Sequence, residues 1–192
     1  MKIHFLTLIC LFLFNVDFSF AQKQTKITFC INANEKELLK LINLYRKTKK
    51  LPAIKLSAEL TKVAKTHIID LTENHADTGV CNTHSWSDKG KWKACCYTDD
   101  HKNAALMWSK PNELTKYKSE GYEIAFETSE EATPTDALSG WKKSPGHNQV
   151  ITETGVFKKM GWKAIGIAVE GHYALVWFGV EPDNETALPE CK

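Results

Sequence analysis

Hydrophobic residues recur every three or four positions over two stretches in the first half of the chain. Residues 38–45 and 60–71 each place their apolar side chains on one face of a helix. Ser57 precedes the second stretch and is a good N-cap. The first helix is predicted to begin after Asn34, with Glu37 three residues on as its capping-box partner. The pattern therefore predicts two amphipathic helices.

Residues 74–97 interrupt this periodicity with polar, aromatic and cysteine side chains. They predict a long ordered loop of the kind that is usually functional inside a compact domain. A short helix is predicted over residues 104–108, capped by residues 98–100 and stopped by Pro111. A further helix is predicted to begin at Pro134, because proline is favoured in a first turn, and to end at Ser-Pro-Gly, residues 144–146.

The last third of the sequence changes to β-rich runs. Strands are predicted at residues 160–162, 165–169 and 173–180, with a tight hairpin turn at residues 170–172. A short strand is also predicted at residues 122–126. Helices followed by a terminal meander predict an α+β domain with helices packed on an antiparallel sheet.

The N-terminus has the features of an export signal. Lys2 is followed by an apolar run at residues 5–14 and by small residues at positions −3 and −1 of a cleavage site after Ala21. The run is too short to span a membrane, and no later segment is apolar enough. Cys10 lacks the small preceding residue of a lipidation site. We therefore predict a secreted or periplasmic protein with a signal at residues 1–21, a lead-in at 22–33, a domain at 34–182 and a polar tail at 183–192.

Charge and cysteine content narrow the function further. Lys and Arg number 25 against 23 Asp and Glu, a net charge of +2, which gives no electrostatic footprint for nucleic acid. The cysteines outside the signal are Cys30, Cys81, Cys95, Cys96 and Cys191. Their odd number leaves at least one thiol unpaired, and export favours disulfides for the rest. We expect Cys81 to pair with one of the two adjacent cysteines and Cys30 with Cys191. Zinc binding by cysteines is the weaker alternative, because no Cys-x-x-Cys pair occurs.

Four segments in order resemble bacterial members of the CAP superfamily, the cysteine-rich secretory, antigen 5 and pathogenesis-related 1 proteins, also called SCP domains. They are Asn-Leu-Tyr-Arg at 43–46 followed by Leu-Pro-Ala-Ile at 51–54, Leu-x-x-x-Ala-x-x-His at 60–67, Gly-Tyr-Glu-Ile-Ala at 121–125 and Trp-x-x-Ser-Pro-Gly-His at 141–147. The resemblance covers about residues 34–182. It implies a three-layer α-β-α sandwich with a central antiparallel sheet and a central cleft.

In this family the cleft holds two histidines and two acidic residues, and in some members the histidines bind a divalent metal. The matching positions here are His84, Glu123 and His147, while Ser144 stands where the second acid is expected. The resemblance thus implies an incomplete set, with His84 and His147 as the candidate ligands of Zn²⁺ or another divalent cation. The alternative is a polar network in which these residues hydrogen-bond to one another. His67, on the apolar stripe of its helix, is interpreted as a buried core histidine.

These observations favour a secreted, monomeric binding module over an enzyme. Its ligand would be a lipid, a glycan or a protein lying in the cleft or against the aromatic-rich loop at residues 74–97. The alternative is a metal-assisted hydrolase of peptide or cell-wall substrates, in which metal-bound water is the nucleophile. The missing acid weighs against that alternative. His172 lies between two predicted strands and is interpreted as a turn residue.

Overall fold

The computed structural model describes residues 29–185 and 188–191, so the predicted signal lies outside the described residues. A four-stranded sheet forms its centre, in the order β1-β3-β4-β2. The strands are β1 (Lys55–Leu56), β2 (Tyr122–Glu127), β3 (Ala164–Glu170) and β4 (Tyr173–Gly179). The last three pair antiparallel, and β1 adds a short parallel edge beside β3. The predicted α+β sandwich is confirmed.

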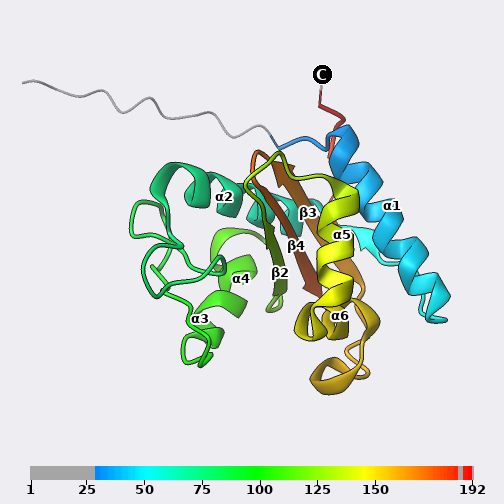
Figure 1. The fold of residues 1–192 in the computed structure, drawn as a ribbon. Coiled ribbons are helices and arrows are strands. Elements are labelled where there is room, and N and C mark those ends of the chain that lie inside the picture. Colours follow the sequence, from blue (N-terminus) through cyan, green and yellow to red (C-terminus); the bar gives the residue numbers. More distant parts are fainter. Residues whose placement is uncertain (1–28, 186–187, 192) are drawn as a thin grey trace, which may run out of the picture.

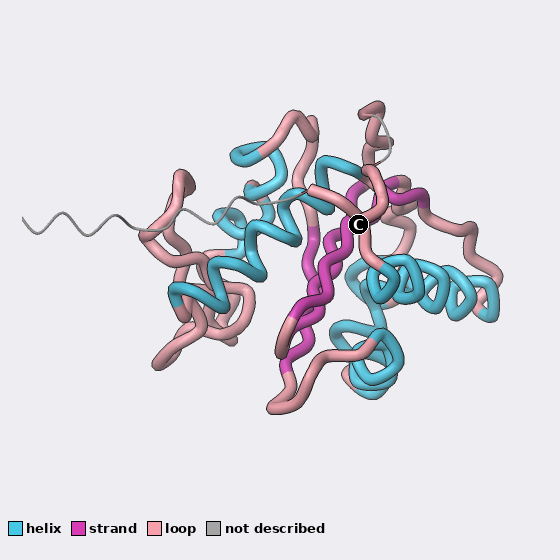
Figure 2. Tube along the Cα trace, turned by 90° about the horizontal axis from the view of Figure 1, so that it is seen from above, coloured by secondary structure: helices cyan, strands magenta, loops and turns pink. Residues whose placement is uncertain are grey.

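Helices cover both faces of this sheet (Figure 1). One layer contains α1 (Ala33–Thr48), α5 (Pro134–Lys143) and α6 (Pro145–Thr152), followed by a 3₁₀ turn, η1 (Gly155–Phe157). The other contains α2 (Ala58–Asn74), α3 (Ala104–Trp108) and α4 (Lys110–Leu114). Seen from above, the strands lie between the two helical layers (Figure 2).

Two hydrophobic cores lie on opposite faces of the sheet. Along β4, Ala174, Val176 and Phe178 join the core beneath α1, α5 and α6, whereas Tyr173, Leu175 and Trp177 join the core beneath α2. Because helices cover both faces of the sheet, β3 and β4 are continuous runs of apolar residues and do not alternate between apolar and polar positions. Gly166 lets α2 lie close to the sheet, since a Cβ there would be 2.1 Å from the backbone carbon of Leu60.

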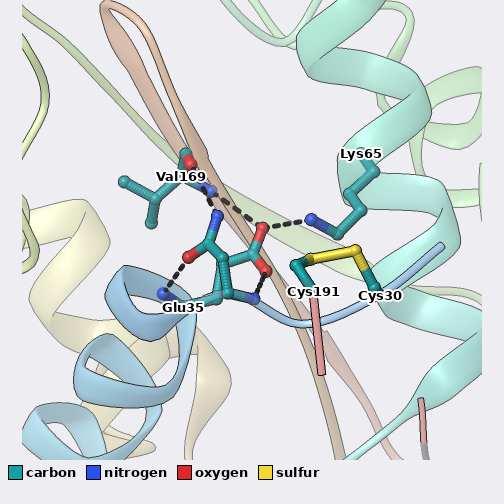
Figure 3. Close-up of a disulfide and its surroundings, with 6 residues drawn as sticks. Cys30, Glu35, Lys65, Val169 and Cys191 are labelled. Carbon is teal, nitrogen blue, oxygen red and sulfur yellow. Dashed lines mark hydrogen bonds and ion pairs between the residues drawn. A yellow bond between two sulfur atoms is a disulfide. The ribbon is translucent and has the colours of Figure 1, made fainter. Parts of the chain in front are cut away.

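Helix α1 begins with the predicted kind of cap, two residues earlier than predicted. Asn32 accepts from the backbone N–H of Glu35 at 2.9 Å, and the Glu35 carboxylate accepts from the N–H of Asn32 at 2.8 Å. The buried Glu35 carboxylate also contacts Lys65 of α2 and the backbone N–H of Val169 in β3 (Figure 3). These tertiary contacts select Glu35 over the half-buried Glu37 as the capping-box partner.

The structure settles the disulfide alternatives. Cys30 pairs with Cys191, as Figure 3 shows, and Cys81 pairs with Cys96, so Cys95 is the free thiol among the cysteines of the described residues. The backbone of Cys95 forms a two-way hydrogen-bonded bridge with Trp86, at 2.7 and 2.9 Å. The side chain of Cys95 is buried beneath α2, so the adjacent Cys96 forms the disulfide with Cys81.

Three local predictions were wrong. Asn103, not residues 98–100, is the N-cap of α3. Pro111 does not end the helical region; it lies at the start of α4, where a missing N–H costs nothing. Residues 160–162 are not a strand, and Trp162 there packs into the core.

His172 lies in the β3–β4 turn, as predicted. Within the described ranges, no helix is long and apolar enough to cross a membrane.

Candidate functional site

A cavity of about 700 Å³ lies beside β2 and is lined by residues of both helical layers. Its apolar wall comprises Ala104, Met107, Trp108, Tyr122, Val150, Val156 and Phe157. Its polar lining comprises Asn82, Thr83, His84, Tyr97, Asp99, His101, Glu123, His147 and Gln149. The structure therefore brings the three predicted site residues to one cavity, whereas Ser144 does not line it. The size is typical of small-molecule sites.

Three different elements carry the predicted residues. His84 lies on the loop closed by the Cys81–Cys96 disulfide, where its N–H donates to the side chain of Asn82 at 3.0 Å. Glu123 is the second residue of β2 and is fixed by pairing with β4. His147 is the third residue of α6, a helix that the sequence interpretation missed. Pro145, taken there as a helix end, begins this second helix, and Ser144 is both the C-cap of α5 and the N-cap of α6.

His67 is buried, and each of its ring nitrogens faces an oxygen atom. Its Nδ1 lies 2.7 Å from Oε1 of Glu123, and its Nε2 lies 2.8 Å from the carbonyl oxygen of Ser85. The carbonyl oxygen only accepts, so Nε2 donates to it; beside an ionised Glu123 carboxylate Nδ1 donates as well, which makes the ring an imidazolium. Burial lowers the pKa of His67, but the charge of Glu123 and the two hydrogen bonds outweigh it and raise that pKa above its ordinary value.

Glu123 connects this cation to the cavity. Its side chain is fully buried, and its second oxygen, Oε2, lies 2.9 Å from Nδ1 of His84. Burial raises the pKa of Glu123, but the charge of His67 and the hydrogen bonds from both histidines reverse the effect and lower it. An ionised carboxylate only accepts, so Nδ1 of His84 is the donor in this contact. The opposite nitrogen of His84, Nε2, has no hydrogen-bond partner among the described residues.

His147 faces His84 without sharing the carboxylate. The two ring centroids are 6.3 Å apart, and the rings are tilted by 58°. Burial, reinforced by His84, lowers the pKa of His147 to about 4, and Glu123 opposes this shift only in part. His147 is therefore a neutral imidazole at pH 7. The polar network was predicted for His84, Glu123 and His147, but the hydrogen bonds through Glu123 join His84 to His67 instead.

Comparison with known proteins places this arrangement in a family. The model of the CAP family, described as the cysteine-rich secretory protein family, matches residues 39–175, more than half of the chain. The chain belongs to the CAP family. None of the curated proteins matches the sequence.

Two solved structures share the CAP fold at low sequence identity. An outer surface protein from Borrelia burgdorferi is 18% identical with a TM-score of 0.51, over 76% of this chain and 91% of that one. An extracellular protein containing an SCP domain from Bacillus anthracis is 16% identical with a TM-score of 0.53, over 76% of this chain and 39% of that one. At these identities the likeness concerns the fold.

The residues of this CAP domain, as placed, do not fit a tetrahedral zinc centre. A zinc–nitrogen bond of about 2.0–2.1 Å puts each ring centroid about 3.2 Å from the ion, so two tetrahedral imidazoles have centroids about 5.2 Å apart. The centroids of His84 and His147 are 6.3 Å apart. Both oxygens of Glu123 are engaged by histidines. Within residues 29–185 and 188–191, no group of three or more His, Cys, Asp or Glu side chains is placed to hold a metal ion.

The sequence interpretation found His67 but missed its role at the site. Its ring stacks on Trp86 with centroids 4.2 Å apart and planes 8° apart, and buried Lys110 lies 5.5 Å from the centroid of the Trp86 ring. Tyr97 and His101, joined by a 2.8 Å hydrogen bond, were missed as cavity residues. For His67 the available signal in the sequence was a histidine on an otherwise apolar helix face, but residue spacing alone could not identify Glu123 as its partner.

Acid should destabilise this CAP domain through His147. Because the pKa of His147 falls from 6.5 to about 4 on folding, the unfolded chain binds a proton more readily between these values. Stability is therefore lost as the pH falls from about 6.5 toward about 4. We expect urea denaturation midpoints to fall less between pH 7 and pH 5 in His147→Gln than in the wild type. Equal changes in the two proteins would contradict this assignment.

Proposed function

We propose that this CAP domain is an exported binding module that holds a small, mainly apolar ligand in the cavity. The observation that carries the proposal is the composition of that cavity. Most of the surface that lines the cavity is apolar, and polar groups make up the smaller part, which is the usual composition of small-molecule sites. Two disulfides support the predicted oxidising, extracytoplasmic compartment. Cleavage after Ala21 and a monomeric state stay predictions.

Three of the seven apolar residues that line the cavity are aromatic, namely Trp108, Tyr122 and Phe157. Tyr122 contacts both Trp108 and Phe157, with ring centroids 5.2 and 5.9 Å apart. Val156, also in the lining, is 84% exposed, so apolar surface reaches the cavity mouth. Binding of a ligand that removes this apolar surface from water is favourable. Of the predicted ligand classes, it favours a lipid-like molecule over a glycan or a protein segment.

The metal-assisted hydrolase has less support in the described residues. Catalytic zinc takes three protein ligands and keeps an open position, whereas His84 and His147 are two ligands with widely spaced rings. Calorimetric titration with Zn²⁺ tests the point. Micromolar binding that is lost in both His84→Ala and His147→Ala would favour the metal site. We expect no binding of that strength.

The binding proposal predicts a specific loss on removing the aromatic wall. We expect Trp108→Ala to weaken binding of the fluorescent probe 1-aminoanthracene about tenfold, because the probe loses a stacked indole worth about 1–1.5 kcal/mol. Leu106→Ala is the matched control, since Leu106 lies on the same helix but outside the cavity. Fluorescence titration measures both constants. The proposal fails if the probe does not bind, or if both variants lose affinity equally.

A further inference from the structure

Nine exposed lysines gather at one end of the CAP domain, which we call the basic end. They come from the end of α1 and the chain that leads from it to β1, from the end of α5, and from the segment between η1 and β3. They are Lys47, Lys49, Lys50, Lys55, Lys142, Lys143, Lys158, Lys159 and Lys163. The ends of α1 and α5 and helix α6 lie toward the lower right of Figure 1.

Specific contacts hold these segments side by side. Arg46 in the last turn of α1 pairs at 2.7 Å with Glu153, the C-cap of α6, so the two helix ends adjoin. Nζ of Lys49 and Nζ of Lys142 lie 5.4 and 4.9 Å from the centroid of the same Tyr45 ring. Strand β1 pairs with the start of β3, which joins the two remaining segments. The lysines therefore form one surface although they are far apart in the sequence.

The lysines of the basic end differ from the others in lacking carboxylate partners. Within residues 29–185 and 188–191, none of the nine forms an ion pair, whereas eight of the eleven lysines elsewhere do. Residues 47–55 and 142–163 contain one acid, Glu153, which is nearly buried and already paired with Arg46. The helix dipole accounts only for the lysines in the last turns of α1 and α5. The net charge of +2 thus conceals a concentrated positive surface that a polyanion would neutralise.

The side chains of the basic end indicate which polyanion fits. The chain has one arginine, Arg46, and it is buried, so this surface has no exposed guanidinium to bind phosphates or bases in a bidentate way. Large apolar side chains are exposed at four positions in the described residues, and none of them is aromatic. Single-stranded nucleic acids stack on exposed aromatic rings, and aromatic rings also anchor proteins in a lipid interface. A hydrophilic chain with spaced carboxylate or sulfate groups needs only the lysines.

We propose that the basic end binds an acidic polysaccharide, whose successive carboxylate or sulfate groups are neutralised by the exposed lysines. This site goes beyond the proposed function, because none of the nine lysines lines the cavity. Binding releases counterions from the polymer, so the affinity falls steeply as the salt concentration rises. Acidic polysaccharides are common polyanions outside the cytoplasm, the compartment that the two disulfides support.

Two fourfold variants with the same net charge test the proposal on the full domain. One changes four lysines of the basic end, as Lys142→Gln, Lys143→Gln, Lys158→Gln and Lys159→Gln. The matched control changes four exposed lysines that form ion pairs elsewhere, as Lys36→Gln, Lys40→Gln, Lys89→Gln and Lys102→Gln. Binding of polygalacturonate and of dextran sulfate is measured by calorimetric titration over a range of salt concentrations, with neutral dextran as the blank.

We expect the variant of the basic end to bind both anionic polymers at least about tenfold more weakly than the control variant at about 0.1 M salt. The slope of log affinity against log salt concentration should be shallower by up to about 3, because four fewer lysines displace counterions. All eight substituted side chains are exposed, so the unfolding midpoints and the binding of 1-aminoanthracene should stay close to those of the wild type.

Equal losses in the two variants would overturn the assignment to the basic end, since they would show that net charge alone decides the affinity. The proposal also fails if neither anionic polymer binds, or if neutral dextran binds as tightly as they do. Tighter binding of duplex DNA, polyglutamate or phosphatidylglycerol vesicles than of either polysaccharide would overturn the ligand class.

Discussion

Replacing Glu123 by Leu lowers the free energy of unfolding by about 3–5 kcal/mol, the usual cost of removing one partner from a buried ion pair. Leucine is similar in size but leaves His67 without an acceptor at Nδ1 and His84 without one at its own Nδ1. His67 must then lose its proton or remain a bare cation in the core. Denaturant unfolding at pH 7 measures the loss.

Glu123→Gln is the matched control, and it should cost less than about 1.5 kcal/mol because both hydrogen bonds can survive. The amide oxygen can accept from His84, and the amide N–H can donate to a neutral His67 whose Nε2–H still meets the carbonyl of Ser85. The nitrogen-15 shifts of the His67 ring should therefore change from imidazolium to neutral imidazole. A neutral His67 in the wild type at pH 7, or equal losses in the two variants, would contradict the charge assignment.

Replacing Arg46 by Met also lowers the free energy of unfolding by about 3–5 kcal/mol, since it leaves a nearly buried carboxylate unpaired. The guanidinium is fully buried and donates to Glu153 and to the carbonyl of Ile151, both at 2.7 Å, and to the carbonyl of Pro52 at 3.1 Å. Methionine fills the apolar space but donates to none of these oxygens. The contacts join the end of α1 to the end of α6, the helix that carries His147.

Lys47→Met is the neighbouring control for this substitution. Lys47 is exposed on the last turn of α1, and loss of its charge should change stability by no more than about 0.5 kcal/mol. Chemical denaturation of both variants checks the difference. A loss below about 1 kcal/mol for Arg46→Met would show that water or other groups replace its three hydrogen bonds.

The sequence predicted the layers of this fold better than its contacts. Apolar periodicity located α1 and α2, and the continuous runs located β3 and β4, because burial on one or both faces leaves a direct trace in residue type. It could not choose Glu35 over Glu37 as the capping residue, because that choice depends on Lys65 and Val169, which are distant in the chain. Two neighbouring cysteines look alike until the backbone pairing of Trp86 is known.

The sequence predicted which residues line the candidate site, but not the hydrogen bonds that join them. The family resemblance pointed to His84, Glu123 and His147, which do line one cavity. It gave no means of seeing that Glu123 bridges His84 to His67, because a hydrogen bond between residues 56 positions apart has no periodic signal. Helix α6 was missed because Ser-Pro-Gly marks a helix end and a helix start with the same residues.

The Cys30–Cys191 disulfide has a mechanical consequence. It joins positions 161 residues apart in the sequence, with Cα atoms 5.0 Å apart. A pulling force applied outside these two cysteines, as on a protein tethered at one end and loaded at the other, passes through the sulfur–sulfur bond. The sheet and the cavity between the two cysteines carry none of that tension while the bond is intact. The cavity would therefore keep its shape under load, and it would become force-sensitive only after reduction.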